Sequence, residues 1–180
     1  MALERRSFAV FNAVSCALVA LVSFRYLLGV GPVPPLIAMN ELKQPWLVLH
    51  VMGAATALLV SPLQLLPRLR EKAPSVHRWL GRVYVLACMV GGVAGALLAA
   101  GSAAGPVASV GFGMLSLLWL YVTTAGFLSA LRGRLAEHRV WMIRSFSLTY
   151  AAVTLRIYLA ILPALPIAFI QGYRAIAFLC

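Results

Sequence analysis

The chain has 180 residues, of which 63% are hydrophobic and 11% are charged. A soluble domain needs roughly a quarter of its residues charged, so this composition excludes an ordinary water-soluble fold. The apolar residues fall in blocks of about twenty, which match the roughly 30 Å hydrocarbon thickness of a bilayer. In such a protein the formal charge of +11 indicates membrane topology and anionic lipid headgroups, and not a nucleic-acid partner.

Five apolar blocks are long enough to cross a membrane, and basic or proline- and glycine-rich segments separate them. In chain order the predicted spans are residues 8–28, 46–66, 79–100, 107–131 and 140–162. A shorter apolar segment, residues 168–180, follows Pro163 and Pro166. We therefore expect one transmembrane domain over residues 1–180. It is an all-α polytopic helical bundle of about six spans, the last of them short or truncated.

Lysine and arginine gather on one side of the predicted spans. That side holds Arg5, Arg6, Arg68, Arg70, Lys72, Arg78, Arg82, Arg132, Arg134, Arg139 and Arg144. The other side holds Arg25, Lys43, Arg156 and Arg174. Because short loops rich in lysine and arginine stay in the cytoplasm, we expect the first side and the N-terminus to be cytoplasmic.

Two predicted helical hairpins carry similar motifs where their second helix begins. The matching pairs are Arg70 and Arg132, His77 and His138, Arg78 and Arg139, Arg82 and Arg144, and Tyr84 and Phe146. This weak repeat predicts two hairpins related by an axis along the membrane normal, as in parallel-repeat membrane folds.

The third predicted span has a small residue at every fourth position, namely Ala87, Gly91, Gly95 and Ala99. Such a stripe lets a neighbouring helix approach closely where lipid removes the hydrophobic drive for association. Packing within the chain is the favoured interpretation. Contact with a second copy of the chain through the same four residues is the alternative.

The fifth predicted span is the most polar. Ser145, Thr149 and Arg156 lie on one stripe that begins at His138, at 100° per residue. An ionisable group deep in a membrane is a functional candidate, and a small transporter would use this stripe as its path. Alternatively, Arg156 extends outward to headgroups, where Glu41 is the acid on its side.

His77 and His138 occupy matching places on different predicted helices. A six-coordinate b-type haem needs two histidines at equal depth, and nearby arginines bind its propionates. His50, which lies nearer the outer side, has Met114 as its conceivable partner. The competing hypothesis is a lipid-contacting scaffold, in which anionic headgroups bind Arg78, Arg82, Arg139 and Arg144.

Other catalytic signatures do not occur in the sequence. It has no aspartate, and its acids are Glu4, Glu41, Glu71 and Glu137. It lacks H-E-x-x-H, G-x-S-x-G and a glycine-rich phosphate loop. These findings exclude paired-carboxylate hydrolysis and leave enzymatic activity open.

The chain resembles an uncharacterised family of bacterial multi-pass membrane proteins. The resemblance rests on the two His-Arg motifs, residues 77–84 (HRWLGRVY) and 138–146 (HRVWMIRSF), and on residues 148–156 that end in TLR. It extends from about His50 to the C-terminus and implies a bacterial cytoplasmic membrane protein. Val140 stands where that family commonly has arginine. Relatives generally continue past residues 173–180, which would complete the last helix.

Overall fold

The computed structural model describes residues 2–180, except for the side chains of residues 2–6 and 8. This part of the chain is helical and contains no strand, which confirms the predicted all-α class. The elements in order are α1 (Ala2–Phe24), α2 (Pro35–Ala38), α3 (Lys43–Gln64), α4 (Pro67–Lys72), α5 (Pro74–Ala100), α6 (Pro106–Leu131), α7 (Leu135–Ile161), the 3-10 turn η1 (Leu162–Ala164) and α8 (Phe169–Leu179).

Four helices of the described chain, α3, α5, α6 and α7, are long and apolar enough to cross a membrane. They correspond to the second to fifth predicted spans. The apolar part of α1, Ala9–Phe24, is shorter than these helices. The 11 residues of α8 extend about 16 Å at 1.5 Å per residue, roughly half of a bilayer's 30 Å hydrocarbon core. The six-span arrangement therefore stays a prediction.

Prolines and glycines mark the ends of these helices. Pro67, Pro74 and Pro106 occupy the first turns of α4, α5 and α6, where the missing N–H has no helical partner to lose. Gly105 and Gly133 adopt positive φ angles of 87° and 72° in the turns before α6 and α7. Glycine adopts this backbone conformation without steric cost, so both turns can be tight.

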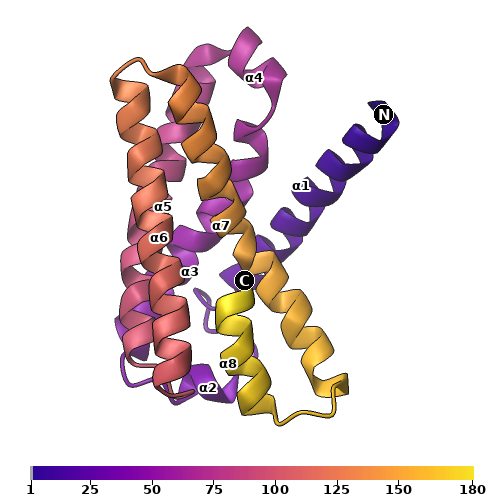
Figure 1. Ribbon diagram of the computed structural model, residues 1–180, viewed down its shortest axis with the longest axis vertical. Coiled ribbons are helices and arrows are strands. Elements are labelled where there is room, and N and C mark those ends of the chain that lie inside the picture. The colour runs from indigo at the N-terminus through magenta and orange to yellow at the C-terminus, as the bar shows by residue number, and fades with distance from the viewer. Residues whose placement is uncertain (1) are drawn as a thin grey trace.

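The long helices pack in sequence, α3 on α5, α5 on α6, and α6 on α7 (Figure 1). Helix α1 contacts α3 and α7, and its N-terminal part leans away from the bundle (Figure 1). Helix α8 lies against α6. The bundle therefore has one end formed by α4 and the α6–α7 turn, and an opposite end formed by α2 and the α5–α6 turn (Figure 1).

Helices α3 and α5 come close together at Gly53 and Gly91. A Cβ atom on Gly91 would lie 2.8 Å from the backbone nitrogen of Ala54. Ala87, Gly91, Gly95 and Ala99 are all buried within the chain. Their position supports the interpretation as intramolecular packing, and self-association through the same residues stays a prediction.

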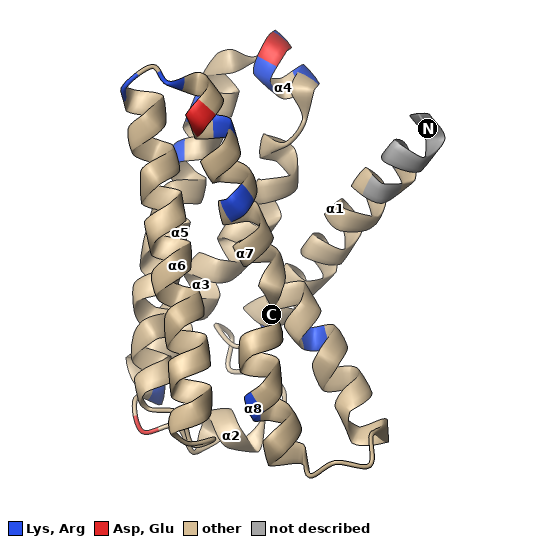
Figure 2. Ribbon diagram, in the orientation of Figure 1, with Lys and Arg blue, Asp and Glu red and all other residues tan. Residues whose placement is uncertain are grey.

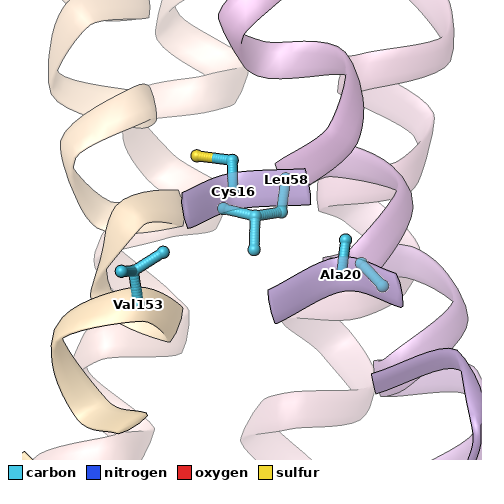
Figure 3. Packing of buried hydrophobic residues seen from close by; sticks show 5 residues of the cluster. Cys16, Ala20, Leu58 and Val153 are labelled. Carbon is cyan, nitrogen blue, oxygen red and sulfur yellow. The ribbon is translucent and has the colours of Figure 1, made fainter. Parts of the chain in front are cut away.

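Helix α1 joins the bundle through a small apolar cluster. Its Cys16 and Ala20 are fully buried against Leu58 of α3 and Val153 of α7 (Figure 3). Elsewhere on α1, Val10, Leu18 and Leu21 remain 59–62% exposed. In a membrane, lipid would cover these side chains, so α1 needs contact with the bundle along one face alone.

We predict that Gly91→Ala destabilises the protein, because the new methyl group meets backbone atoms that cannot move aside independently. Overpacking of this kind costs about 1–3 kcal/mol in the free energy of unfolding. Gly113→Ala is the matched control, since the nearest atom to its Cβ is 4.0 Å away. Unfolding in mixed micelles with increasing dodecyl sulfate measures both variants. Equal stability of the two would contradict the close packing of α3 and α5.

Candidate functional site

The end of the bundle that carries α4 and the α6–α7 turn gathers most of the described lysine and arginine residues (Figure 2). We call this region the basic end. It comprises Arg68, Arg70, Lys72, Arg78, Arg82, Arg132, Arg134, Arg139 and Arg144, all of them exposed. The acids among the same segments are Glu71 and Glu137. Cations thus greatly outnumber anions there, and their side chains are available to a ligand.

One ion pair forms among the described residues of this end. Arg134 Nη1 lies 3.2 Å from a carboxylate oxygen of Glu137, one turn along α7. Both side chains are about half exposed, so the pair contributes little to stability. The other arginines at this end have no acid within salt-bridge distance in the described chain.

A hollow of about 270 Å³ opens on the outer surface between α6 and α7, directly at the basic end. The residues around it are Tyr121, Thr124, Ala125, Leu128, Ser129, Arg132, Arg134, Glu137 and Trp141. A second hollow of about 330 Å³ continues beyond Trp141 and reaches Arg144. The two hollows share Glu137 and Trp141, and we call them together the groove. It has Arg132 and Arg134 at one end, Arg144 at the other and an aromatic, apolar wall between them.

Trp141 stands at the centre of the groove and is held by two contacts. Its ring meets Tyr121 of α6 edge to face, with ring centroids 5.7 Å apart. The second contact is with Arg144, whose guanidinium carbon lies 4.6 Å from the centroid of the Trp141 ring. These aromatic and cation–π contacts fix the indole between the two hollows.

His77 lies in the first turn of α5, beside the C-terminal end of α3. Its backbone carbonyl accepts a hydrogen bond from Gln64 Nε2 at 3.1 Å. The ring nitrogen Nδ1 of His77 and the amide oxygen Oε1 of Gln64 are buried, and neither has a hydrogen-bond partner among the described residues. Arg70, Arg78 and His138 lie near enough to act electrostatically on the His77 ring. The structure therefore places His77 and His138 at the same end of the bundle.

His138 and His50 each bond to a glycine carbonyl on a neighbouring helix. Nδ1 of His138 is 2.8 Å from the oxygen of Gly126, and Nδ1 of His50 is 2.8 Å from that of Gly91. A carbonyl can only accept, so both rings carry a proton on Nδ1. In the neutral ring this leaves Nε2 as the basic atom. Neither hollow of the groove is lined by these histidines.

The polar stripe of α7 lies at the centre of the bundle. Ser145 and Thr149 are buried, and each accepts or donates a hydrogen bond of 2.8 Å with the Tyr84 hydroxyl of α5. On α6, Thr123 bonds to Ser145 at 2.6 Å and the Trp119 indole N–H donates to Thr149 at 2.9 Å. The first two residues of the predicted transport path are thus engaged in a cluster that ties α5, α6 and α7 together.

Tyr84, Trp119 and Thr123 were not among the candidates predicted from the sequence. Trp119 and Thr123 are four residues apart, so they share one face of α6. Two hydrogen-bonding residues with this spacing in an apolar span were the feature of the sequence that could have indicated the cluster. The pairing with Ser145 and Thr149 depends on the helix arrangement, which the spacing alone does not determine.

Arg156 binds within the bundle and not to Glu41. Its Nη2 atom donates to Ser23 Oγ of α1 at 2.7 Å, and its Nη1 atom donates to the carbonyl of Ala152 at 2.8 Å. His50 lies near enough to sense the charge of Arg156. The guanidinium therefore links α7 to α1, and it is separate from the basic end.

An all-helical chain with several helices that can cross a bilayer defines the class, a multi-pass membrane protein. Residues 47–180 match the family model described as Predicted membrane protein (DUF2306), and the chain belongs to that family. The match confirms the predicted membership of an uncharacterised membrane-protein family, while the bacterial origin stays a prediction. No curated protein and no solved structure matches the chain.

Proposed function

We propose that this protein is a non-enzymatic membrane protein whose basic end binds anionic phospholipid headgroups at the cytoplasmic face of a bacterial inner membrane. The observation that carries the proposal is the concentration of nine exposed cations at one end of the bundle, opposed by Glu71 and Glu137. Anionic lipids attract each cation near their surface, and the attraction grows with the number of cations.

The arginines of the two His-Arg motifs are suited to this contact. Arg78 and Arg82 lie in the first three turns of α5, and Arg139 and Arg144 lie in the first three turns of α7. All four are exposed, and they lie within or next to apolar helical segments. Long arginine side chains in such places lay their apolar stems along the helix and place the guanidinium among headgroups.

The bonding capacity of arginine adds specificity for phosphate. Its planar guanidinium presents five N–H donors in a fixed geometry that matches phosphate oxygens bidentately. Because Arg134 is paired with Glu137, the remaining arginines at the basic end hold the greater free capacity. A phosphate-bearing lipid is therefore favoured over a neutral one.

We predict that Arg78→Gln/Arg139→Gln lowers the ratio of anionic to zwitterionic phospholipid that co-purifies with the protein. Each lost charge weakens binding about fivefold, since one cation near an anionic surface contributes about 1 kcal/mol. Arg25→Gln/Lys43→Gln removes two charges from the opposite side and leaves the ratio unchanged. Mass spectrometry of the extracted lipids measures it. The same ratio in both variants and the natural protein would reject headgroup binding at the basic end.

A second candidate function, b-type haem binding, rests on the His77 ring. Its Nδ1 atom is buried without a partner in the described chain, and His138 lies nearby. If haem binds, the two imidazoles would serve as axial ligands, and Arg70 and Arg78 would bind the propionates. The bond from His138 Nδ1 to Gly126 supports this role, because it leaves Nε2 available to iron. His50 would lie outside that site.

The haem hypothesis predicts a Soret band that shifts on dithionite reduction, with sharp α and β bands, in protein purified from haem-supplemented cells. His77→Ala should abolish these bands, because a low-spin iron needs both axial ligands. His50→Ala serves as the control and should keep them. A spectrum without a Soret band from well-folded protein would reject haem binding and leave the lipid proposal unaffected.

A further inference from the structure

We propose that the groove between α6 and α7 binds one anionic phospholipid at a defined site, with its phosphate at Arg132 and Arg134 and an acyl chain against Trp141. This inference rests on the proposed function and identifies where one lipid is held. Its basis is a hollow that combines cations at the helix ends with an apolar wall below them.

The polar end of the groove fits a phosphodiester. Arg132 and Arg134 flank the tight turn at Gly133 and are both exposed. Glu137 contributes a carboxylate to the same lining and pairs with Arg134. The contact with Glu137 uses Nη1 of Arg134, so the N–H groups on the other two guanidinium nitrogens remain for a phosphate. Arg132 has no acid within salt-bridge distance in the described chain, so its full donor set is available to phosphate.

The apolar length of the groove fits the upper part of an acyl chain. From Arg132 down to Tyr121 the helix descends 11 residues, about 16 Å at 1.5 Å per residue. Leu128 and Trp141 line the path, and Tyr121, which contacts Trp141 edge to face, lies at its lower end. The guanidinium of Arg144 lies over the Trp141 ring and adds a third cation to the lining of the groove.

The surface around the groove favours a lipid over a soluble phosphate compound. Exposed apolar residues continue along α6 below the groove, where Leu117 and Leu118 are 62% and 49% exposed. A membrane-embedded helix turns such residues toward hydrocarbon. The groove therefore opens into the acyl region of the bilayer, and a ligand that enters it from there must itself carry an apolar chain.

The test counts bound lipids by native mass spectrometry on the full-length protein in detergent, with phosphatidylglycerol added at increasing concentration. The groove variant is Arg132→Gln/Arg134→Gln/Arg144→Gln. The matched control, Arg68→Gln/Arg70→Gln/Lys72→Gln, removes three charges from α4 at the same end of the bundle. We expect the natural protein and the control to retain one tightly held lipid, and the groove variant to bind it at least tenfold more weakly.

Four outcomes would overturn the inference. Equal weakening in both variants would leave headgroup binding by the basic end intact and reject a defined groove site. If the natural protein shows no preference for anionic over zwitterionic lipid, the proposed function is rejected as well. Displacement of the lipid by millimolar glycerol 3-phosphate would show that the acyl chain adds nothing. A dimer mass that disappears in the groove variant would assign the groove to a second copy of the chain.

A further variant separates lipid binding from folding. Leu128→Ser leaves every charge of the groove in place and makes its apolar wall polar. Leu128 is 39% exposed, so the substitution does not open a cavity in the core. We expect weaker binding of phosphatidylglycerol at unchanged unfolding stability. Unchanged binding would contradict the placement of an acyl chain in the groove.

Discussion

The hydrogen-bonded cluster around Tyr84 holds the centre of the bundle together, and the rest of the structure depends on it. Hydrocarbon offers no water to a polar side chain, so each hydroxyl inside the bundle needs a partner from the chain. Tyr84, Ser145 and Thr149 satisfy one another across α5 and α7, and α6 adds Trp119 and Thr123. Any rotation or sliding of one helix would break several of these bonds together.

This arrangement fixes the position of the basic end of the bundle. Because α6 and α7 are bound near their middle, the short turn between them brings Arg132 and Arg134 beside the first turns of α7. Nearer to that turn, the hydrogen bond from His138 to the Gly126 carbonyl also holds α6 and α7 together. A groove with a fixed width results, and a fixed groove can select one lipid where a mobile surface would attract many weakly.

Arg156 and His50 belong to a different part of the molecule. They link α7 to α1 and α3 to α5 through hydrogen bonds to Ser23 and Gly91. Polar residues that join membrane helices in this way act as structural ties. Their contacts support a structural role in this half of the bundle, while the basic end carries the features that suit a ligand.

The sequence predicted the helical class and the positions of the four long helices, because these depend on composition and local pattern. The small-residue stripe also predicted close packing, which the structure places between Gly91 and Gly53. Other features depend on which helix faces which, and single-sequence periodicity carries no such information. The partners of Ser145 and Thr149 and the hollow beside Trp141 are examples. The bond between Arg156 and Ser23 joins residues far apart in the chain, so no local pattern could reveal it.

Headgroup binding in the cytoplasmic leaflet requires the basic end to face the cytoplasm. Cysteine labelling with a membrane-impermeant maleimide measures this in cells that express a chain with alanine in place of Cys16, Cys88 and Cys180. Ala103 is exposed in the α5–α6 turn and Ala136 in the first turn of α7, at opposite ends of the bundle, and each is replaced separately by cysteine. We predict that A103C is labelled in intact cells and A136C only after the cells are permeabilised. The opposite pattern would place the basic end outside and contradict binding to the cytoplasmic leaflet.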